Sequence, residues 1–253
     1  MNLSNRIFLF NILLLAIFLN PLKGYWGFSS LLSNENPTID AILDIYEYQM
    51  GTYSEWRKVN SIKKTGVIVT DEEVFEISIY NKLPDLVKVI IQKKEPKSPK
   101  FVQVVNEDGI HSYLLKSNGE IELKEPLLDL SDDRNIMPNL MHLKREEYWE
   151  TELTNANDAF FEVTLSKENT NKVFRFSIDK KTMTISEQLV SEGDKLTKFS
   201  YNGLIQSDRL KFYNKITVYN QDGKVELVFS KFQTNLGIAN SFFDLPQIYK
   251  TKF

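Results

Sequence analysis

A repeated alternation of apolar and polar residues is the feature that most constrains the fold of this chain. In residues 74–79, Phe75, Ile77 and Ile79 fall on one side of an extended backbone, because successive side chains of a strand point to opposite faces. The same alternation returns at these positions: Val87, Val89 and Ile91; Val102 and Val104; Phe161, Val163 and Leu165; Phe174, Phe176 and Ile178; Leu210 and Phe212; Val225, Leu227 and Phe229. Such segments predict half-buried strands with one apolar face.

Turn sequences separate these segments. The pairs are Asp108-Gly109, Asn118-Gly119, Asn202-Gly203 and Asp222-Gly223. Each supplies a glycine that takes a positive φ at little cost, as tight hairpins require. The chain also holds 17 Phe, 11 Tyr and 3 Trp against 10 Gly and 8 Pro, a balance that favours strands over loops. We therefore expect a mainly β fold built from successive antiparallel hairpins.

Two segments have helical spacing instead. Thr38 is placed to cap a helix that Gly51 ends, and its apolar positions are Ile39, Ile42, Ile45, Tyr46 and Met50. A second apolar cluster lies between Leu127 and Tyr148, where Pro138 keeps any helix short, and it contains Ile136, Met137, Leu140, Met141 and Leu143. These two segments are the available cover for the apolar face of a sheet.

The alternation also predicts which side chains face that cover. We expect an apolar site lined by Phe75, Ile77, Val89, Ile91, Val102 and Val104, with Glu76, Ser78, Lys88 and Gln103 facing water. We place Met137, Leu140 and Met141 on a movable cover above it, together with Ile42 and Tyr46. If the cover fills the concave face, the protein has an ordinary core; if it does not, an apolar cavity remains.

The N-terminus has the layout of a secretory signal. Residues 7–19, IFLFNILLLAIFL, follow Arg6 and precede Asn20-Pro21. This run is shorter than the roughly 20 residues that a membrane-spanning helix needs, so we expect a cleaved signal peptide, residues 1–24 or up to Ser29. An uncleaved anchor is the alternative. Residues 30–253 are expected to form a single domain, with two domains as the other possibility, and to reside in the periplasm.

Several classes of function have no support in the residues. The net charge is −3 with lysines and arginines spread along the chain, so we expect no nucleic-acid partner. With zero cysteines, disulfides, thiolate metal sites and an acylated cysteine are excluded. The two histidines, His111 and His142, form no metal-binding motif, and neither a Gly-x-Ser-x-Gly elbow nor a nucleotide-binding loop is present. We expect no cofactor, no metal and no enzymatic activity.

The order of these features resembles the LolA-like family of periplasmic lipoprotein carriers over essentially the whole mature chain. The segments that carry the resemblance are Tyr48-Gln49-Met50-Gly51, Ile62-Lys63-Lys64-Thr65-Gly66-Val67, Lys82-Leu83-Pro84-Asp85-Leu86-Val87-Lys88, Glu107-Asp108-Gly109-Ile110-His111-Ser112-Tyr113, Ile178-Asp179-Lys180-Lys181-Thr182 and Asn240-Ser241-Phe242-Phe243-Asp244-Leu245-Pro246. The chain departs from the family at Lys82, where the carrier often has an arginine implicated in closing a lid, and this makes Lys82 a candidate lid contact.

The resemblance implies an open, curved antiparallel β half-barrel with helices over its concave face and an acyl-chain site between them. It implies a soluble carrier or chaperone for the acyl chains of lipoproteins or other lipids, acting towards the outer membrane. Its partners would be inner- and outer-membrane lipoprotein-trafficking proteins. A sensor or adaptor that uses the same fold to recognise a protein is the alternative, and an enzyme comes last.

Overall fold

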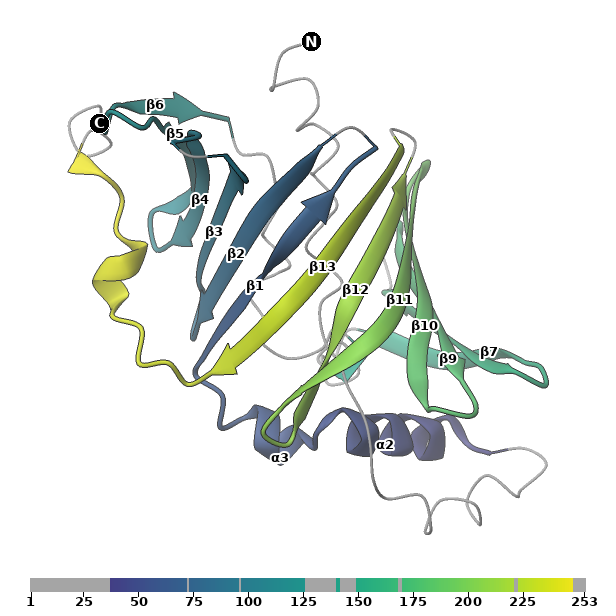
Figure 1. Ribbon diagram of the computed structural model, residues 1–253. Helices are drawn as coiled ribbons and strands as arrows, with labels where there is room; N and C mark the ends of the chain where they lie inside the picture. The colour runs from purple at the N-terminus through teal and green to yellow at the C-terminus, as the bar shows by residue number, and fades with distance from the viewer. Residues whose placement is uncertain are drawn as a thin grey trace. The chain divides into compact units, whose positions relative to one another are not determined.

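The computed structural model describes residues 37–71, 73–95, 97–125, 140–141, 149–167, 170–220 and 223–247. Within these residues, thirteen strands are joined in one antiparallel sheet (Figure 1). The strand order is β6-β5-β4-β3-β2-β1-β13-β12-β11-β10-β9-β8-β7. From β1 to β6 and from β7 to β12, each strand pairs with its neighbour in sequence. The expected mainly β fold of consecutive hairpins is confirmed.

Tertiary contacts group the chain into two units. Among the described residues, the first unit contains those of 58–125 and 223–247, and the second contains those of 37–57 and 140–220. The expectation of a single domain over residues 30–253 stays a prediction.

The first unit consists of seven strands and a short 3-10 helix within the described residues. Their bounds are β1 (Ser61–Val69), β2 (Val74–Lys82), β3 (Leu86–Lys93), β4 (Lys100–Asn106), β5 (Gly109–Leu115), β6 (Ile121–Lys124), β13 (Gly223–Thr234) and η2 (Asn240–Phe243). The turn at Asn118-Gly119 joins β5 to β6, and Gly119 has the positive φ of 85° that its position requires. The Gly119 amide donates to the Lys116 carbonyl at 3.0 Å, which closes this hairpin.

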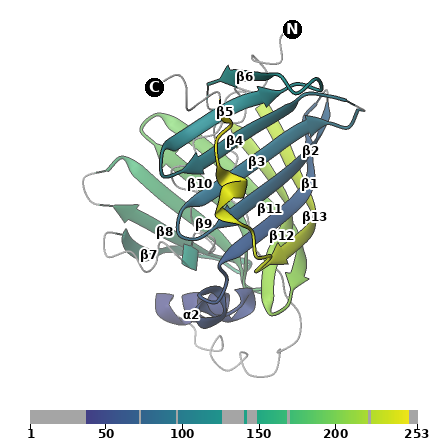
Figure 2. The same cartoon turned by 90° about the vertical axis from the view of Figure 1, so that its left-hand side faces the viewer.

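The core of the first unit lies on both faces of its sheet. Residues 101–105 of β4 are all buried, so this strand is covered on its two sides. One cover is the C-terminal segment, residues 235–246, whose helix η2 contacts β3 and β4 (Figure 2). Phe243 of η2 is 1% exposed and packs with Val102, Val104 and Tyr113. A sheet covered on both faces differs from the one-sided sheet that the alternation predicted.

The second unit combines the helical segment at the start of the described chain with six strands. The elements are α2 (Ile39–Met50), α3 (Tyr53–Trp56), β7 (Trp149–Ala156), β8 (Phe160–Lys167), β9 (Lys172–Asp179), β10 (Thr184–Glu192), β11 (Lys195–Ser207) and β12 (Leu210–Asn220). Thr38 caps α2 by accepting a hydrogen bond from the Ala41 amide at 3.3 Å, and Gly51 follows its last residue with a φ of 93°. Both expected ends of this helix are confirmed.

The apolar side of α2 packs onto the strands of its own unit. Ile42, Ile45 and Tyr46 are buried, whereas Asp44 on the opposite side is exposed. The contacts of α2 include β10 and β12. Beyond Gly51, Trp56 of α3 meets Phe212 of β12 edge to face, with ring centroids 5.3 Å apart. Helical spacing therefore produces a single buried stripe that holds the helix against the sheet.

Candidate functional site

Four of the expected site residues lie together on one face of the first unit, which we call the Val89 face. Strand pairing places Ile77 opposite Ile91 and Ile79 opposite Val89, and directly paired residues share a face. Phe75 lies on the same face and is half-buried. The buried side chains of this face include Ile77, Ile79, Val87, Val89, Ile91, Phe101, Gln103 and Val105. The expected grouping of Phe75, Ile77, Val89 and Ile91 is therefore present.

The predicted orientation of β4 is wrong. Gln103 pairs with Val89 and is 0% exposed, so it belongs to the Val89 face and does not point to water. Val104 pairs with Lys88, and Val102 lies on the same side as Val104. We call this second side the Val104 face. Val102 and Val104 are thus separated from Val89 by the thickness of the sheet.

The C-terminal segment explains this difference. It covers the Val104 face with Ile238, Phe242 and Phe243, so apolar residues on that side of β4 are buried as well. Because both faces of β4 need apolar side chains, the alternation does not reveal which residues lie on the Val89 face and which lie on the Val104 face. A polar residue in such a strand is not a marker of solvent, although the alternation predicts that Gln103 faces water.

Lys82 and Lys88 hold the backbone of the C-terminal segment. The Lys82 ammonium donates to the Ile238 carbonyl at 2.5 Å and to Asn240 Oδ1 at 2.6 Å. The Lys88 ammonium donates to the Phe242 carbonyl at 2.7 Å and lies 4.5 Å from the centre of that ring. Burial lowers the pKa of Lys88, and the charge of Asp244 partly offsets this. The expectation that Lys88 faces water is wrong, because its ammonium binds the C-terminal segment. Lys82 is expected to contact a lid, and the hydrogen bonds described for it go to the same segment.

A larger apolar face belongs to the second unit, and we call it the Phe176 face. Strand pairing aligns Val163, Phe176, Gln188, Phe199 and Val218 in one row across β8 to β12. Neighbouring rows add these buried side chains: Phe161, Leu165, Phe174, Ile178, Ile185 and Val190. One face thus receives apolar side chains from five strands, with a single amide, Gln188, in its central row.

The expected cover residues fall in the second unit where the structure describes them. Ile42 and Tyr46 are 0% and 1% exposed on α2. Leu140 and Met141 are helical and both are 0% exposed. Met137 lies outside the described residues. Their placement on a movable cover stays a prediction.

A cluster of tyrosines beside α2 was not foreseen from the sequence. Tyr201 Oη donates to Gln188 Oε1 at 2.6 Å, and the Tyr201 and Tyr213 rings lie 4.5 Å apart. Tyr213 Oη donates to the Ile185 carbonyl. Burial, followed by the proximity of Tyr46 and Tyr201, raises the pKa of Tyr213 well above its usual value. The chain of contacts runs from α2 through β12 and β11 to β10.

Helical spacing places Tyr46 among the apolar positions of α2, yet its hydroxyl is the atom that stands out. Burial, and secondarily the charge of Glu47, raises the pKa of Tyr46 well above its usual value. Among the described residues, neither Tyr46 Oη nor Gln188 Nε2 has a hydrogen-bond partner, although both atoms are buried. The sequence carries no signal for this cluster, because it depends on the pairing of three strands and on the position of a helix.

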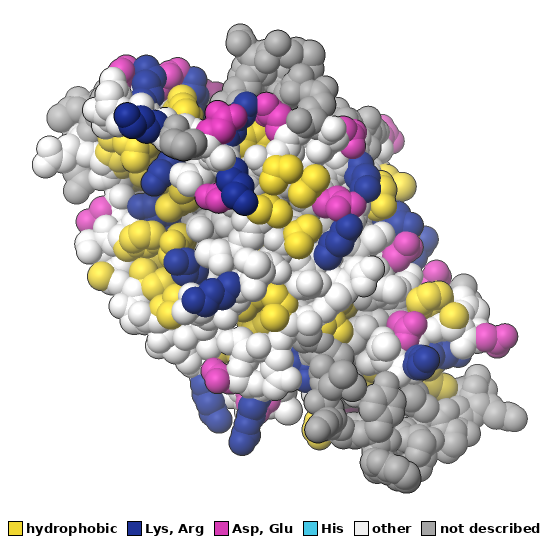
Figure 3. Space-filling model, viewed as in Figure 1, with side chains coloured by type: hydrophobic (Ala, Val, Ile, Leu, Met, Phe, Trp, Pro, Cys, Tyr) yellow, Lys and Arg dark blue, Asp and Glu magenta, His cyan; other side chains and the backbone are white. Residues whose placement is uncertain are grey.

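The described residues contain no group of three side chains that could hold a metal ion. In the same part of the chain, no helix is both long enough and apolar enough to span a membrane. On the face shown in Figure 3, apolar side chains occur in small groups separated by lysines, arginines and acidic residues. The buried side chains of the Val89 and Phe176 faces are mainly apolar, and the polar ones include Gln103, Gln188 and Lys64, which pairs with Ile79 and is 4% exposed.

Comparisons with known proteins identify the fold. No family model matches the sequence, and no curated protein matches it. A solved structure of a DUF1329 family protein from Desulfovibrio piger has 11% identity and a TM-score of 0.53, over 83% of this chain and 98% of that one. A LolA superfamily protein from Nitrosomonas europaea has 10% identity and a TM-score of 0.50, over 83% and 99% of the two chains. The chain therefore has a LolA-like fold.

Proposed function

We propose that this protein with a LolA-like fold is a periplasmic carrier that binds the acyl chains of lipoproteins or other lipids and takes them towards the outer membrane. The observation that supports the proposal is the Phe176 face, to which five strands contribute apolar side chains in aligned rows. Hydrocarbon packed against such a surface gains about 0.8 kcal/mol for each methylene removed from water. The proposal requires no covalent chemistry.

The N-terminal sequence supports the proposed location. Its apolar run at residues 7–19 has the length and flanks of a cleaved signal, which would release residues 30–253 into the periplasm. Without a cysteine, the released chain has no site for acylation and could move between the membranes. Inner- and outer-membrane lipoprotein-trafficking proteins are the proposed partners for loading and delivery.

The proposed cover consists of Ile42 and Tyr46 on α2 together with Leu140 and Met141. Single helices and short segments can shift at lower cost than a strand whose backbone is bonded on both sides. In this scheme the cover moves aside when an acyl chain enters the Phe176 face. Moderate affinity is sufficient, because a carrier must also release its cargo.

Lipid analysis of the exported protein tests the proposal. The full chain is expressed with its own N-terminus, the periplasmic product is purified, and an organic extract is analysed by mass spectrometry. We expect acylated lipid to accompany the protein, and we expect the lipid-free protein to bind a fluorescent fatty-acyl probe. Absence of lipid from the extract together with absence of probe binding would overturn the proposal.

A matched pair of variants distinguishes a binding face from a core. Phe176→Ala and Phe243→Ala each remove a phenylalanine that is at most 1% exposed, the first from the Phe176 face and the second from η2. Both should lower stability, and Phe176→Ala alone should change the affinity for the acyl probe. Equal probe binding by the two variants would argue that the Phe176 face is a filled core.

A further inference from the structure

Two buried hydrogen-bonding atoms in the tyrosine cluster are unsatisfied within the described residues. Tyr46 Oη on α2 and Gln188 Nε2 on β10 are shielded from solvent and have no partner there. Buried polar atoms in folded proteins are almost always hydrogen-bonded, so an unpaired atom calls for an explanation such as a bound group. Two of them in one connected cluster indicate a place prepared for a polar group.

The contacts of the cluster link these two atoms. Tyr46 lies close enough to Tyr213 to influence its ionisation, and the Tyr213 ring packs on the Tyr201 ring at 4.5 Å. Tyr201 Oη then donates to Gln188 Oε1 at 2.6 Å. This bond fixes the amide and leaves Nε2 without a hydrogen-bond partner among the described residues. The amide nitrogen is a donor, and the hydroxyl of a protonated tyrosine can donate as well.

The electrostatics of the cluster select a neutral acceptor. The raised pKa values of Tyr46 and Tyr213 keep both phenols protonated at neutral pH, so both remain uncharged. Glu47 places negative charge near Tyr46, which disfavours an anion such as a phosphate or a free carboxylate. A carbonyl oxygen is an uncharged acceptor that can receive two hydrogen bonds.

We propose that Tyr46 and Gln188 bind the carbonyl oxygen at the head of an acyl chain, in an ester or an amide, while the hydrocarbon lies along the Phe176 face. This inference rests on the proposed carrier function and specifies how the cargo is oriented. Gln188 lies in the middle row of that face, between Phe176 and Phe199, so one ligand can contact the amide and the apolar rows together. Because Tyr46 is on α2, the same hydrogen bond closes the helix over the bound chain.

Three uncharged ligands of similar length test the inference: methyl palmitate, N-methylpalmitamide and heptadecane. Each displaces a fluorescent acyl probe from the lipid-free protein, and affinities are compared for the wild type, Tyr46→Phe and Tyr48→Phe. Tyr48 is 52% exposed on the same helix, so Tyr48→Phe removes the same atom outside the cluster. We expect Tyr46→Phe to weaken both carbonyl ligands about tenfold and to leave heptadecane unchanged, as loss of one hydrogen bond predicts.

The possible outcomes separate this inference from the carrier proposal. If heptadecane does not bind the wild type, the apolar site fails and both proposals are overturned. If heptadecane binds but Tyr46→Phe leaves the carbonyl ligands unchanged, or weakens all three ligands equally, the inference alone is overturned.

Thermal unfolding of the lipid-free variant gives a second test. We expect an equal or higher midpoint, because an unpaired buried hydroxyl has been removed. A lower midpoint with unchanged ester affinity would assign Tyr46 to a buried water and overturn the inference.

Discussion

Gly66 lies at an irregularity in the pairing of β1 with β13 in the first unit. The register between the two strands shifts at Thr65 and Gly66, and an added Cβ at Gly66 would lie 2.1 Å from the Val228 carbonyl oxygen. Because that oxygen belongs to the backbone, the strand itself would have to move. The glycine is therefore required by space rather than by backbone conformation.

We predict that Gly66→Ala lowers the free energy of unfolding by about 1–3 kcal/mol, the usual cost of overpacking. Urea unfolding followed by circular dichroism measures the change. Gly119→Ala is the comparison, since nothing lies within 4 Å of its added Cβ and its cost comes from the positive φ alone. An unchanged midpoint for Gly66→Ala would mean that β1 and β13 are not paired in this register.

Tyr46 gives a prediction about pH. Its pKa is raised in the folded protein, so its contribution to stability is complete below the unfolded value of 10.0 and is lost as pH rises above it. The free energy of unfolding of the wild type should therefore fall relative to that of Tyr46→Phe above pH 10, by at most about 1.4 kcal/mol per pH unit. Denaturant unfolding at a series of alkaline pH values measures this difference. Tyr48→Phe keeps Tyr46 and should follow the wild type, and a parallel pH dependence of the wild type and Tyr46→Phe would contradict the burial of this phenol.

At the scale of elements, the C-terminal segment acts as part of the first unit's core. Its residues Phe242 and Phe243 pack on strands β2 to β5, and the lysines of β2 and β3 bind its carbonyl groups. The Tyr80 and Phe242 rings are 4.7 Å apart, and the Asn106 amide donates to the Phe243 carbonyl at 3.4 Å. Side chains on the sheet thus satisfy the backbone of a segment that has no strand partner of its own.

Phe243→Ala should lower the free energy of unfolding by about 3–5 kcal/mol, because it empties a fully buried site. Leu236→Ala is the control, since Leu236 lies in the same segment and is 39% exposed. Thermal denaturation and binding of a dye specific for exposed apolar surface would follow the two variants. If both lose the same small amount of stability, the segment is not a structural cover of the Val104 face.

The alternation of residues predicts the orientation of a strand best when other parts of the chain cover only one of its faces. In β2, residues 75, 77 and 79 were assigned correctly to one face, because charged and apolar positions differ clearly along this strand. In β4, the cover of the second face comes from the far end of the chain, so Val102, Gln103 and Val104 were oriented incorrectly. The tyrosine cluster escaped prediction for a related reason: its hydrogen bonds depend on the pairing of β10, β11 and β12, which turns alone do not specify.

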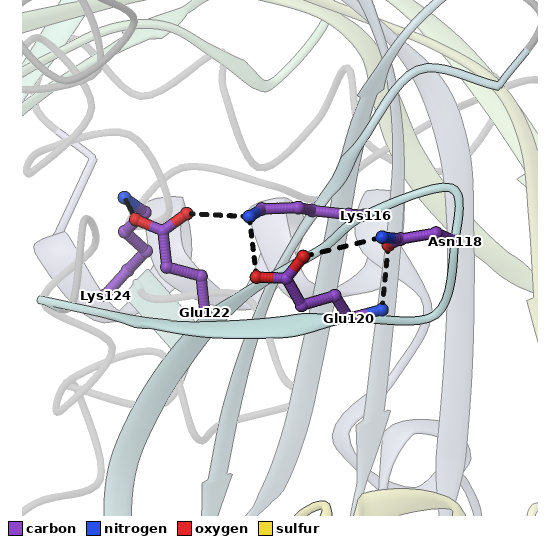
Figure 4. Close-up of polar contacts among 5 residues, drawn as sticks. All are labelled: Lys116, Asn118, Glu120, Glu122 and Lys124. Atoms are coloured by element: carbon purple, nitrogen blue, oxygen red, sulfur yellow. Dashed lines mark hydrogen bonds and ion pairs between the residues drawn. The ribbon is translucent and has the colours of Figure 1, made fainter.

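At the scale of the whole molecule, the edge strands of the sheet are where one copy of the protein could pair with another. Within the described residues, β6 and β7 are the last strands of the order, and β6 has only four residues. The hairpin of β5 and β6 carries a network of ion pairs (Figure 4). Lys116 Nζ lies 2.9 Å from Glu120 Oε1, and Glu122 pairs with Lys124. These pairs lower the pKa values of Glu120 and Glu122, so both carboxylates stay charged at neutral pH.

Exposed ion pairs of this kind add little stability, and their position suggests a different effect. A free strand edge presents unpaired backbone groups, and short, charged edge strands discourage pairing with another chain. The charges of β6 are therefore expected to affect association more than folding.

We predict that replacing Glu120, Glu122 and Lys124 together by threonine causes concentration-dependent self-association while leaving the unfolding midpoint nearly unchanged. Threonine favours strands and removes the charge that repels a second edge. Size-exclusion chromatography with light scattering over a range of concentrations measures the effect. The control replaces Glu187 and Lys198 by threonine, because this exposed pair, 2.5 Å apart, lies on the interior strands β10 and β11. The control should elute as the wild type does. Equal association of the two variants would mean that loss of surface charge, rather than the edge at β6, is responsible.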